Sequence, residues 1–335
     1  MRAEPIIGHT GLRGIAALCV FIHHLHLDRW FPNTPFQFVA FLASWPGYAV
    51  DLFFILSGFI LGHVYSSNIN WKQYFIARFA RIFPLSLAVV VFCVGLDLYS
   101  KIAHDIPSAN LEFSRILYNI LNIQSWYGNA VENSINPPSW SISVEVFLYI
   151  FVLPVLYYFL RFKTPRKISI FLFGLLVLLL IFPTLSFYHS FPFQSLIRGV
   201  ILFTAGFGIK KVTQIFASPS WSSIAALIAV LIIVVAIFKG LEKSYIIYPA
   251  LFSLVYFTSF NNSASAALGF PFLAWLGERS YSIYILHHPL IVVFFRLVLY
   301  PNMGEGDYPL WVVSLTLLLI FISTFVCAEI SYRFF

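Results

Sequence analysis

The chain has 335 residues, of which 60% are hydrophobic, 19% are aromatic and only 10% are charged. Soluble domains carry about 25% charged residues, so this composition excludes an ordinary soluble protein and predicts an all-α polytopic integral membrane protein. The net charge of +7 is spread over short loops and does not indicate nucleic-acid binding. The three cysteines lie in apolar runs without metal-ligand spacing, so we expect neither a disulfide framework nor a metal site.

Apolar runs near the ~20-residue length of a membrane helix predict about ten transmembrane helices in one bundle. An even number places both termini on one side, and most lysines and arginines fall on that side, which predicts cytoplasmic termini. We expect a single transmembrane domain over residues 1–335, with no appended soluble domain. The expected spans are 10–28, 47–66, 82–100, 140–160, 168–187, 194–210, 221–238, 245–260, 280–299 and 310–330.

The first expected span carries an arginine near one end and a histidine pair near the other. The eleven steps from Arg13 to His24 make about three helical turns and rise roughly 16 Å, so both side chains share one face. Ionisable groups inside membrane segments are usually functional; the alternative is a snorkelling arginine and an interfacial histidine. Asp28, one turn after His24, is either an orienter of the imidazole or a solvated carboxylate.

Other spans carry single polar residues that need partners. Asp51, at the outer end of the second span, needs a partner, a proton or water. Ser57 lies among small residues that suit close helix packing, with a site role as the alternative. Arg198 must reach the outer interface or a buried acid. Glu329 and Arg333, four residues apart, predict a helix-end ion pair.

The segment YFIARFARIFP places two arginines three residues apart on one helix face. Arg78 and Arg81 can grip phosphates in a fork geometry that lysine cannot match; the alternative is positive-inside arginines that face lipid headgroups. Pro84 is expected in the first turn of the third span.

The fourth span opens with PPSWSISVEVFLY. Glu145 lies about one and a half turns into the bilayer, where a carboxyl group must be protonated, paired or in a polar cavity. His24 approaches the same side, so we expect the two residues at similar depth. The long connection that precedes this span, Lys101 to Ser139, carries aromatic residues that either contact a sugar or lie at the headgroup level.

The ninth span reads SYSIYILHHP. His287 and His288 precede Pro289, and Tyr281 shares a helix face with His288. We expect one of these histidines to face the bundle interior.

Five motifs occur in the order and spacing of the membrane-bound acyltransferase-3 family, which the chain resembles over almost its whole length. They are LRGIAALCVFIHH, VDLFFILSGF, RFARIFP, PPSWSISVEVFLY and LGERSYSIYILHHPL. The resemblance implies a ten-helix acyltransferase of the bacterial cytoplasmic membrane that O-acylates surface carbohydrates. It takes an acyl group, commonly acetyl from acetyl-CoA, on the cytoplasmic side and delivers it to a saccharide on the other side.

The resemblance also implies site residues. The family's proposed active-site arginine and histidine fall on Arg13 and His24. The arginines of its RFARIFP motif map to Arg78 and Arg81. We expect these three arginines to form the coenzyme A site.

Two further motif positions match with one departure. The glutamate of the fourth-span motif falls on Glu145, but many members carry a second acidic residue next to it, where this chain has Val146. That difference weakens any scheme with paired carboxylates. The histidine of the ninth-span motif maps to His287, and His288 occupies a variable position.

Acyl transfer from a thioester to a hydroxyl needs a base, donors for the developing oxyanion and anchors for the donor's phosphates. We expect His24 to be the base, oriented by Glu145 or Asp28. Whether the acyl group rests on a side chain such as Ser141 stays open. A transporter or flippase for a saccharide or lipid-linked precursor is the alternative function, although we find no matched repeats; a non-catalytic scaffold is a third. Further site candidates are Asp51, Ser57, Trp140, Ser141, Arg198, Tyr281 and His287.

Overall fold

The computed structural model describes residues 6–31, 46–65, 69–105, 107–159, 193–215, 219–239, 244–295 and 309–334, and the single positions 39 and 174. Within these ranges all regular secondary structure is helical, with no strand. The all-α prediction is therefore confirmed for the described part of the chain. The fifth expected span, 168–187, lies outside the described residues except for position 174.

Four of the described helices are long and apolar enough to cross a membrane: Pro46–Val64, Trp71–Ala103, Pro137–Tyr158 and Leu310–Phe334. Helices of 18 residues or more rise at least about 27 Å, close to the ~30 Å hydrocarbon core. Shorter apolar helices cover Ser222–Phe238, Ile246–Phe257 and Ser280–Phe294. These helices support the membrane class, whereas the count of ten spans and the cytoplasmic termini stay predictions.

The helices agree with the expected spans to within several residues in most places and add short helices that the sequence did not indicate. In chain order they are α1 (Ile7–His24), α2 (Leu27–Trp30), α4 (Pro46–Val64), α5 (Trp71–His104), η1 (Ala109–Leu111), α6 (Phe113–Ile120), η2 (Pro137–Ser139), α7 (Trp140–Phe147), the π-helical η3 (Leu148–Val152), α8 (Leu153–Phe159), α10 (Gln194–Thr213), α11 (Ser222–Phe238), α12 (Ser244–Phe257), α13 (Ser263–Leu268), α14 (Pro271–Glu278), α15 (Ser280–Phe294) and α16 (Leu310–Phe334).

Two boundaries correct the sequence expectations. The first helix ends at His24 and does not continue to 28, because His26 adopts a left-handed conformation with φ 49° that no α-helix interior contains. The third span begins at Trp71, so Pro84 lies inside α5 and not in its first turn. A proline there removes one backbone hydrogen bond, and the apolar residues that follow it continue the helix.

The chain forms two compact units. The first unit comprises Met1–Ala16, Trp45–Tyr74 and Glu145–Glu278, and the second comprises Ala17–Ser44, Phe75–Val144 and Arg279–Phe335. The expectation of a single domain over 1–335 stays a prediction.

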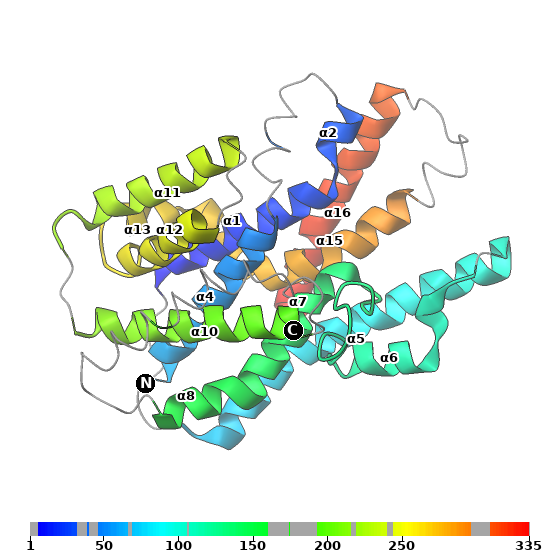
Figure 1. Ribbon diagram of the computed structural model, residues 1–335. Coiled ribbons are helices and arrows are strands. Elements are labelled where there is room, and N and C mark those ends of the chain that lie inside the picture. The colour runs from blue at the N-terminus through cyan, green and yellow to red at the C-terminus, as the bar shows by residue number, and fades with distance from the viewer. Residues whose placement is uncertain are drawn as a thin grey trace. The chain divides into compact units, whose positions relative to one another are not determined.

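In the first unit α4 packs against α10, and α11 packs against α12 (Figure 1). Two glycines let α4 and α10 approach backbone to backbone. A Cβ on Gly58 would lie 1.9 Å from Phe203 O, and a Cβ on Gly206 would lie 1.9 Å from Ile55 O. Gly58 of the second span therefore serves close helix packing, while the role of Ser57 stays a prediction.

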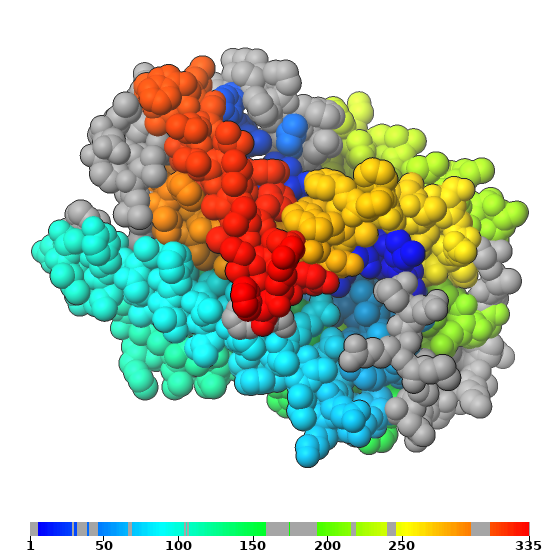
Figure 2. Space-filling view, turned by 180° about the vertical axis from the view of Figure 1, so that it is seen from behind, coloured from blue at the N-terminus to red at the C-terminus, as the bar shows by residue number. Residues whose placement is uncertain are grey.

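In the second unit α15 packs against α16 (Figure 1). Figure 2 shows α16, in red, along the molecular surface. Exposed apolar side chains such as Leu315, Leu318, Ile322 and Val326 follow α16, as suits contact with lipid tails. The buried side of the unit includes Phe21, Ile291 and Ile320, and this core joins the end of α1 to α15 and α16.

Candidate active site

His24, the last residue of α1, contacts His287 of α15 within the second unit. His24 Nδ1 lies 3.3 Å from His287 Nε2, and the ring centroids are 5.0 Å apart. His287 is fully buried and His24 is half-buried. The histidines of two separate sequence motifs therefore meet at one point, and His287 is the histidine that faces the interior.

Backbone carbonyls determine which nitrogen of each ring carries the proton. Val20 O lies 2.8 Å from His24 Nδ1, and Ile283 O lies 3.1 Å from His287 Nδ1. Because a carbonyl oxygen only accepts, we assign the proton of each neutral ring to Nδ1. His24 Nδ1–H then faces both Val20 O and the lone pair of His287 Nε2. In this tautomer His24 Nε2 carries no proton and can act as a base.

Further histidines surround His24. The rings of His23 and His288 lie edge to face with it, with centroids 5.3 Å and 5.8 Å away. Among the described residues, no group of three or more His, Cys, Asp or Glu side chains could hold a metal ion. The expectation that the protein uses no metal stays a prediction.

A pair of hydroxyl groups lies next to the histidines. Ser141 Oγ of α7 is 2.7 Å from Tyr284 OH of α15, and Tyr284 OH donates to Pro138 O at 2.9 Å. The Tyr284 ring centroid is 6.0 Å from that of His287. The hydrogen bond between Ser141 and Tyr284 thus lies beside the histidine pair.

The connection before α7 folds back onto that helix. Ser125 Oγ donates to Trp140 O at 2.7 Å, and Trp126 Nε1 donates to Ser143 O at 3.0 Å. The indole N–H of Trp126 therefore supports the fold, while Tyr127 is exposed and packs on Tyr118.

Two other predicted residues of the second unit have different surroundings. Tyr281 OH donates to Ile82 O at 2.7 Å, which ties α15 to α5. Asp28 is exposed on α2, and its role as orienter of His24 stays a prediction.

The three arginines predicted to bind coenzyme A lie on two helices. Arg78 is half-buried and Arg81 exposed near the beginning of α5. Arg13 is half-buried on α1, in the first unit. Their role in donor binding stays a prediction.

Glu145 lies in the first unit and bonds to two hydroxyl groups. Ser57 Oγ donates to Glu145 Oε1 at 3.1 Å, and Tyr149 OH donates to the same oxygen. Tyr149 is one residue into the π-helical η3, and its carbonyl accepts from Tyr74 OH at 3.0 Å. Single π-helical turns recur at functional sites. The expectation that Glu145 orients His24 stays untested.

Asp51 and Arg198 of the first unit form an ion pair, so each is the partner that the other required. Arg198 Nη2 donates to Asp51 Oδ2 at 2.5 Å, and Tyr248 OH donates to the same oxygen at 3.2 Å. The Asp51 side chain is fully buried and that of Arg198 is 25% exposed. The sequence indicated that both needed a partner, but not that they pair with one another.

A second ion-pair group lies at the end of α16. Arg333 Nε donates to Glu329 Oε1 at 2.8 Å, as the spacing predicted. Arg279 also donates to Glu329, and its guanidinium lies over the Tyr332 ring at 4.2 Å.

A family model described as an acyltransferase domain matches residues 7–329. The chain is 24% identical over 365 residues to the peptidoglycan O-acetyltransferase OatA of Listeria monocytogenes. The matched region covers 97% of this chain and 54% of that protein. It is 31% identical over 163 residues to the acyltransferase MdmB of Streptomyces mycarofaciens, covering 47% of this chain and 40% of that protein.

A third relative, from Staphylococcus aureus, is provisionally named an O-acetyltransferase. It is 26% identical over 372 residues, covering 100% of this chain and 57% of that protein. The chain thus spans about half the length of these curated relatives. No solved structure matches the chain.

Proposed function

Because the chain belongs to the acyltransferase-3 family, we propose that it is a membrane O-acyltransferase of the bacterial cytoplasmic membrane. It moves an acyl group, taken here as acetyl, from cytoplasmic acyl-CoA to a hydroxyl of an extracytoplasmic polysaccharide. The names of two relatives support acetyl as the group and oxygen as the acceptor atom.

The contact between His24 and His287 carries this proposal. A half-buried imidazole with an unprotonated Nε2 can take a proton from a hydroxyl. His287 Nε2, 3.3 Å away, accepts from His24 Nδ1–H and holds the ring in this tautomer. That hydrogen bond strengthens when His24 becomes cationic. His287 is thus a positioning residue that acts through His24.

The proposed step balances without a further reactant. His24 Nε2 removes the proton of the acceptor hydroxyl while the hydroxyl oxygen attacks the thioester carbonyl carbon. The C–O bond forms, the C–S bond breaks, and coenzyme A leaves as a thiolate, which takes the proton back from His24. If the acyl group instead rests on the protein, Ser141 is the candidate carrier.

The donor's phosphates are assigned to arginine side chains. Arg78 and Arg81 lie one helical turn apart on α5, and a guanidinium binds phosphate through two parallel hydrogen bonds. Arg13 is the third candidate. Asp28 and Glu145 are the candidates for orienting His24.

The test is the acetyl content of surface polysaccharide from cells that produce the wild-type protein, His24→Ala or a matched control at equal levels. The control is His26→Asn, because asparagine tolerates the left-handed conformation of His26 and the change removes a neighbouring imidazole. We expect His24→Ala to lose about 10²- to 10⁴-fold in rate and His26→Asn to retain activity. Full acetylation with His24→Ala would show that the base assignment is wrong.

A further inference from the structure

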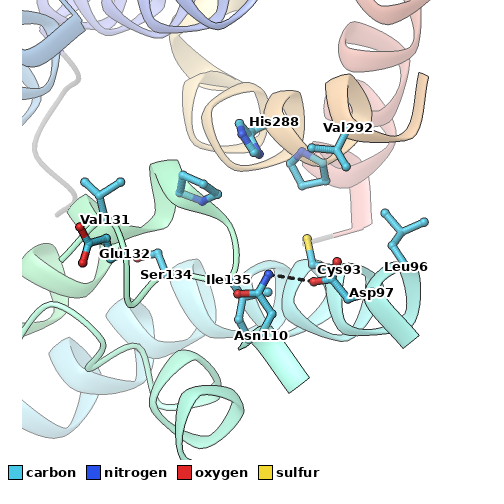
Figure 3. Close-up of a pocket in the computed structure, with 12 residues that line it drawn as sticks. Cys93, Leu96, Asp97, Asn110, Val131, Glu132, Ser134, Ile135, His288 and Val292 are labelled. Atoms are coloured by element: carbon cyan, nitrogen blue, oxygen red, sulfur yellow. Dashed lines mark hydrogen bonds between the residues drawn. The ribbon is translucent and has the colours of Figure 1, made fainter. Parts of the chain in front are cut away.

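A pocket of about 360 Å³ opens in the second unit beside the histidine pair. Its walls come from α5, η1, the segment before η2 and α15, with Asp97 and Asn110 on one side and His288 on another (Figure 3). Its volume lies within the ~300–1,000 Å³ range of small-molecule sites. One wall comes from the non-helical segment before η2 and consists of Val131, Glu132, Ser134 and Ile135.

The polar part of the pocket is rich in hydrogen-bond acceptors. Asn110 Nδ2 donates to Asp97 Oδ2 at 2.8 Å, and Asp97 is only 6% exposed. This bond directs the amide nitrogen of Asn110 toward the carboxylate, while an ionised carboxylate has about four acceptor sites. Glu132, which is exposed, adds a second carboxylate to the lining. Such a lining suits a ligand that donates several hydrogen bonds, and two carboxylates repel an anionic one.

The rest of the lining is apolar. Val131, Ile135, Pro137, Pro289 and Val292 line the pocket. A ligand that fits both parts has hydroxyl groups at its edge and C–H groups on its face. A sugar ring has this arrangement, whereas a phosphate has no apolar face.

The pocket lies one side chain away from the candidate base. His288 lines the pocket, and its ring lies edge to face with that of His24, with centroids 5.8 Å apart. A ligand bound between Asp97 and His288 therefore has one edge near the histidines. Three of the pocket residues, Pro137, His288 and Pro289, belong to motifs of the sequence analysis, whereas the polar residues Asp97, Asn110 and Glu132 do not.

We propose that this pocket is the acceptor subsite and that it takes an uncharged or amino sugar, with Asp97 and Glu132 excluding uronic acids. This inference rests on the proposed function, because a pocket next to His24 serves transfer only if His24 is the base. Asp97 accepts hydrogen bonds from sugar hydroxyls, Asn110 keeps its carboxylate in place, and the His288 end presents one hydroxyl to His24.

Binding is tested separately from transfer through Cys93, which also lines the pocket. In the full-length protein carrying Cys19→Ala and Cys327→Ala, Cys93 is the remaining thiol, and its rate of reaction with N-ethylmaleimide is followed by intact mass. The probes are neutral tetrasaccharides of glucose, galactose or N-acetylglucosamine and, for comparison, tetragalacturonate. At about ten times its Kd, a neutral sugar that fills the pocket slows labelling roughly tenfold. Tetragalacturonate gives no protection.

Transfer is measured with the same sugars and labelled acetyl-CoA. Asp97→Asn is expected to raise the KM for the neutral sugar by about 10- to 100-fold, and Glu132→Gln is expected to let tetragalacturonate act as an acceptor, with the KM for acetyl-CoA unchanged in both. Glu132→Gln is the second variant because Glu132 is exposed and tolerates replacement. The control is Glu112→Gln, an exposed acid that caps α6 without a side-chain hydrogen bond and lies outside the pocket.

The two proposals fail in different ways. The acceptor subsite is overturned, and the acyltransferase left intact, if transfer occurs with an unchanged sugar KM in Asp97→Asn, no transfer to tetragalacturonate in Glu132→Gln and no protection of Cys93. If neutral sugars protect Cys93 but neither the wild-type protein nor any variant transfers acetyl, the sugar pocket is supported and the proposed function is rejected. No protection by any neutral sugar and no transfer reject both.

Discussion

Asn136 Nδ2 donates to the carbonyl oxygen of Ile285 at 2.9 Å. This carbonyl of α15 lacks its usual helical donor, because residue 289 is a proline. In an α-helix the carbonyl of residue 285 accepts from the N–H of residue 289, which proline lacks. Asn136 is 1% exposed, so its amide replaces the missing donor inside the protein. The bond also joins the segment before α7 to the helix that carries His287.

Removal of this amide should destabilise the protein. Asn136→Ala leaves the Ile285 carbonyl buried without its donor, which costs about 1–3 kcal/mol. In a Pro289→Ala background the helix supplies its own N–H, so the same change should cost less. Reversible unfolding of the purified protein in detergent measures this double-mutant cycle. Additive losses would mean that Asn136 stabilises the protein by other contacts.

His287 should affect turnover and not donor binding. His287→Ala removes the acceptor of His24 Nδ1–H, so kcat should fall by about tenfold or more, while the KM for acyl-CoA stays constant. His287→Gln retains an oxygen acceptor and should restore part of kcat. Asp28→Asn and Glu145→Gln, measured beside it, compare the other two orienter candidates. An equal loss in His287→Gln and His287→Ala, with both folded, would indicate that an amide cannot substitute and that the imidazole itself is required.

Arg78 and Arg81 should contribute to donor affinity. Arg78→Ala and Arg81→Ala should weaken acyl-CoA binding by about tenfold with little change in saccharide binding. The lysine variants should recover only part, because an ammonium lacks the guanidinium fork. Arg333→Ala is the control, since its exposed ion pair with Glu329 contributes little to stability. Equal loss for donor and acceptor in the arginine variants contradicts a phosphate site.

The buried ion pair of the first unit should behave as a unit. Asp51→Ala leaves Arg198 without its carboxylate and should destabilise the protein by about 3–5 kcal/mol. Arg198→Met in the same chain removes the uncompensated charge and should recover part of that loss. Tyr248→Phe should cost about 1 kcal/mol. Denaturant unfolding in detergent tests this cycle, and a double variant as unstable as the sum of the two singles would argue against direct coupling.

Glycine-to-alanine substitutions should have opposite effects at different helix positions. Gly58→Ala and Gly206→Ala place a methyl group 1.9 Å from a backbone oxygen of the opposite helix, so each should destabilise the protein by about 1–3 kcal/mol. Gly95→Ala is the matched control in α5, where a Cβ meets nothing within 4 Å. It should stabilise the protein by up to about 1 kcal/mol. Thermal unfolding in one detergent compares all three.

Much of the candidate site could be predicted because it consists of charged or polar residues in apolar helices. Arg13, His24, Asp51 and Arg198 were notable from sequence because such groups are rare within spans. Their partners were not predictable, because helical periodicity indicates the face of a residue but not the helix opposite. Asp51 meets Arg198 across 147 positions, and no local spacing reports such a contact.

Local geometry changed other expectations. The end of α1 at His24 depends on the left-handed conformation of His26. Histidine adopts this conformation more often than most residues, but a histidine in the sequence does not by itself predict it. Pro84 resembled a helix start, yet residues on both sides continue α5.

The sequence by itself determined the membrane class, the apolar helices and the motifs of the family, because composition and residue order are local properties of the chain. Only the tertiary structure decided that His287 is the partner of His24, that Asn136 completes α15 and that Asp97 and His288 line one pocket. These contacts join residues more than 100 positions apart, and side-chain packing determines which of the available polar groups meet.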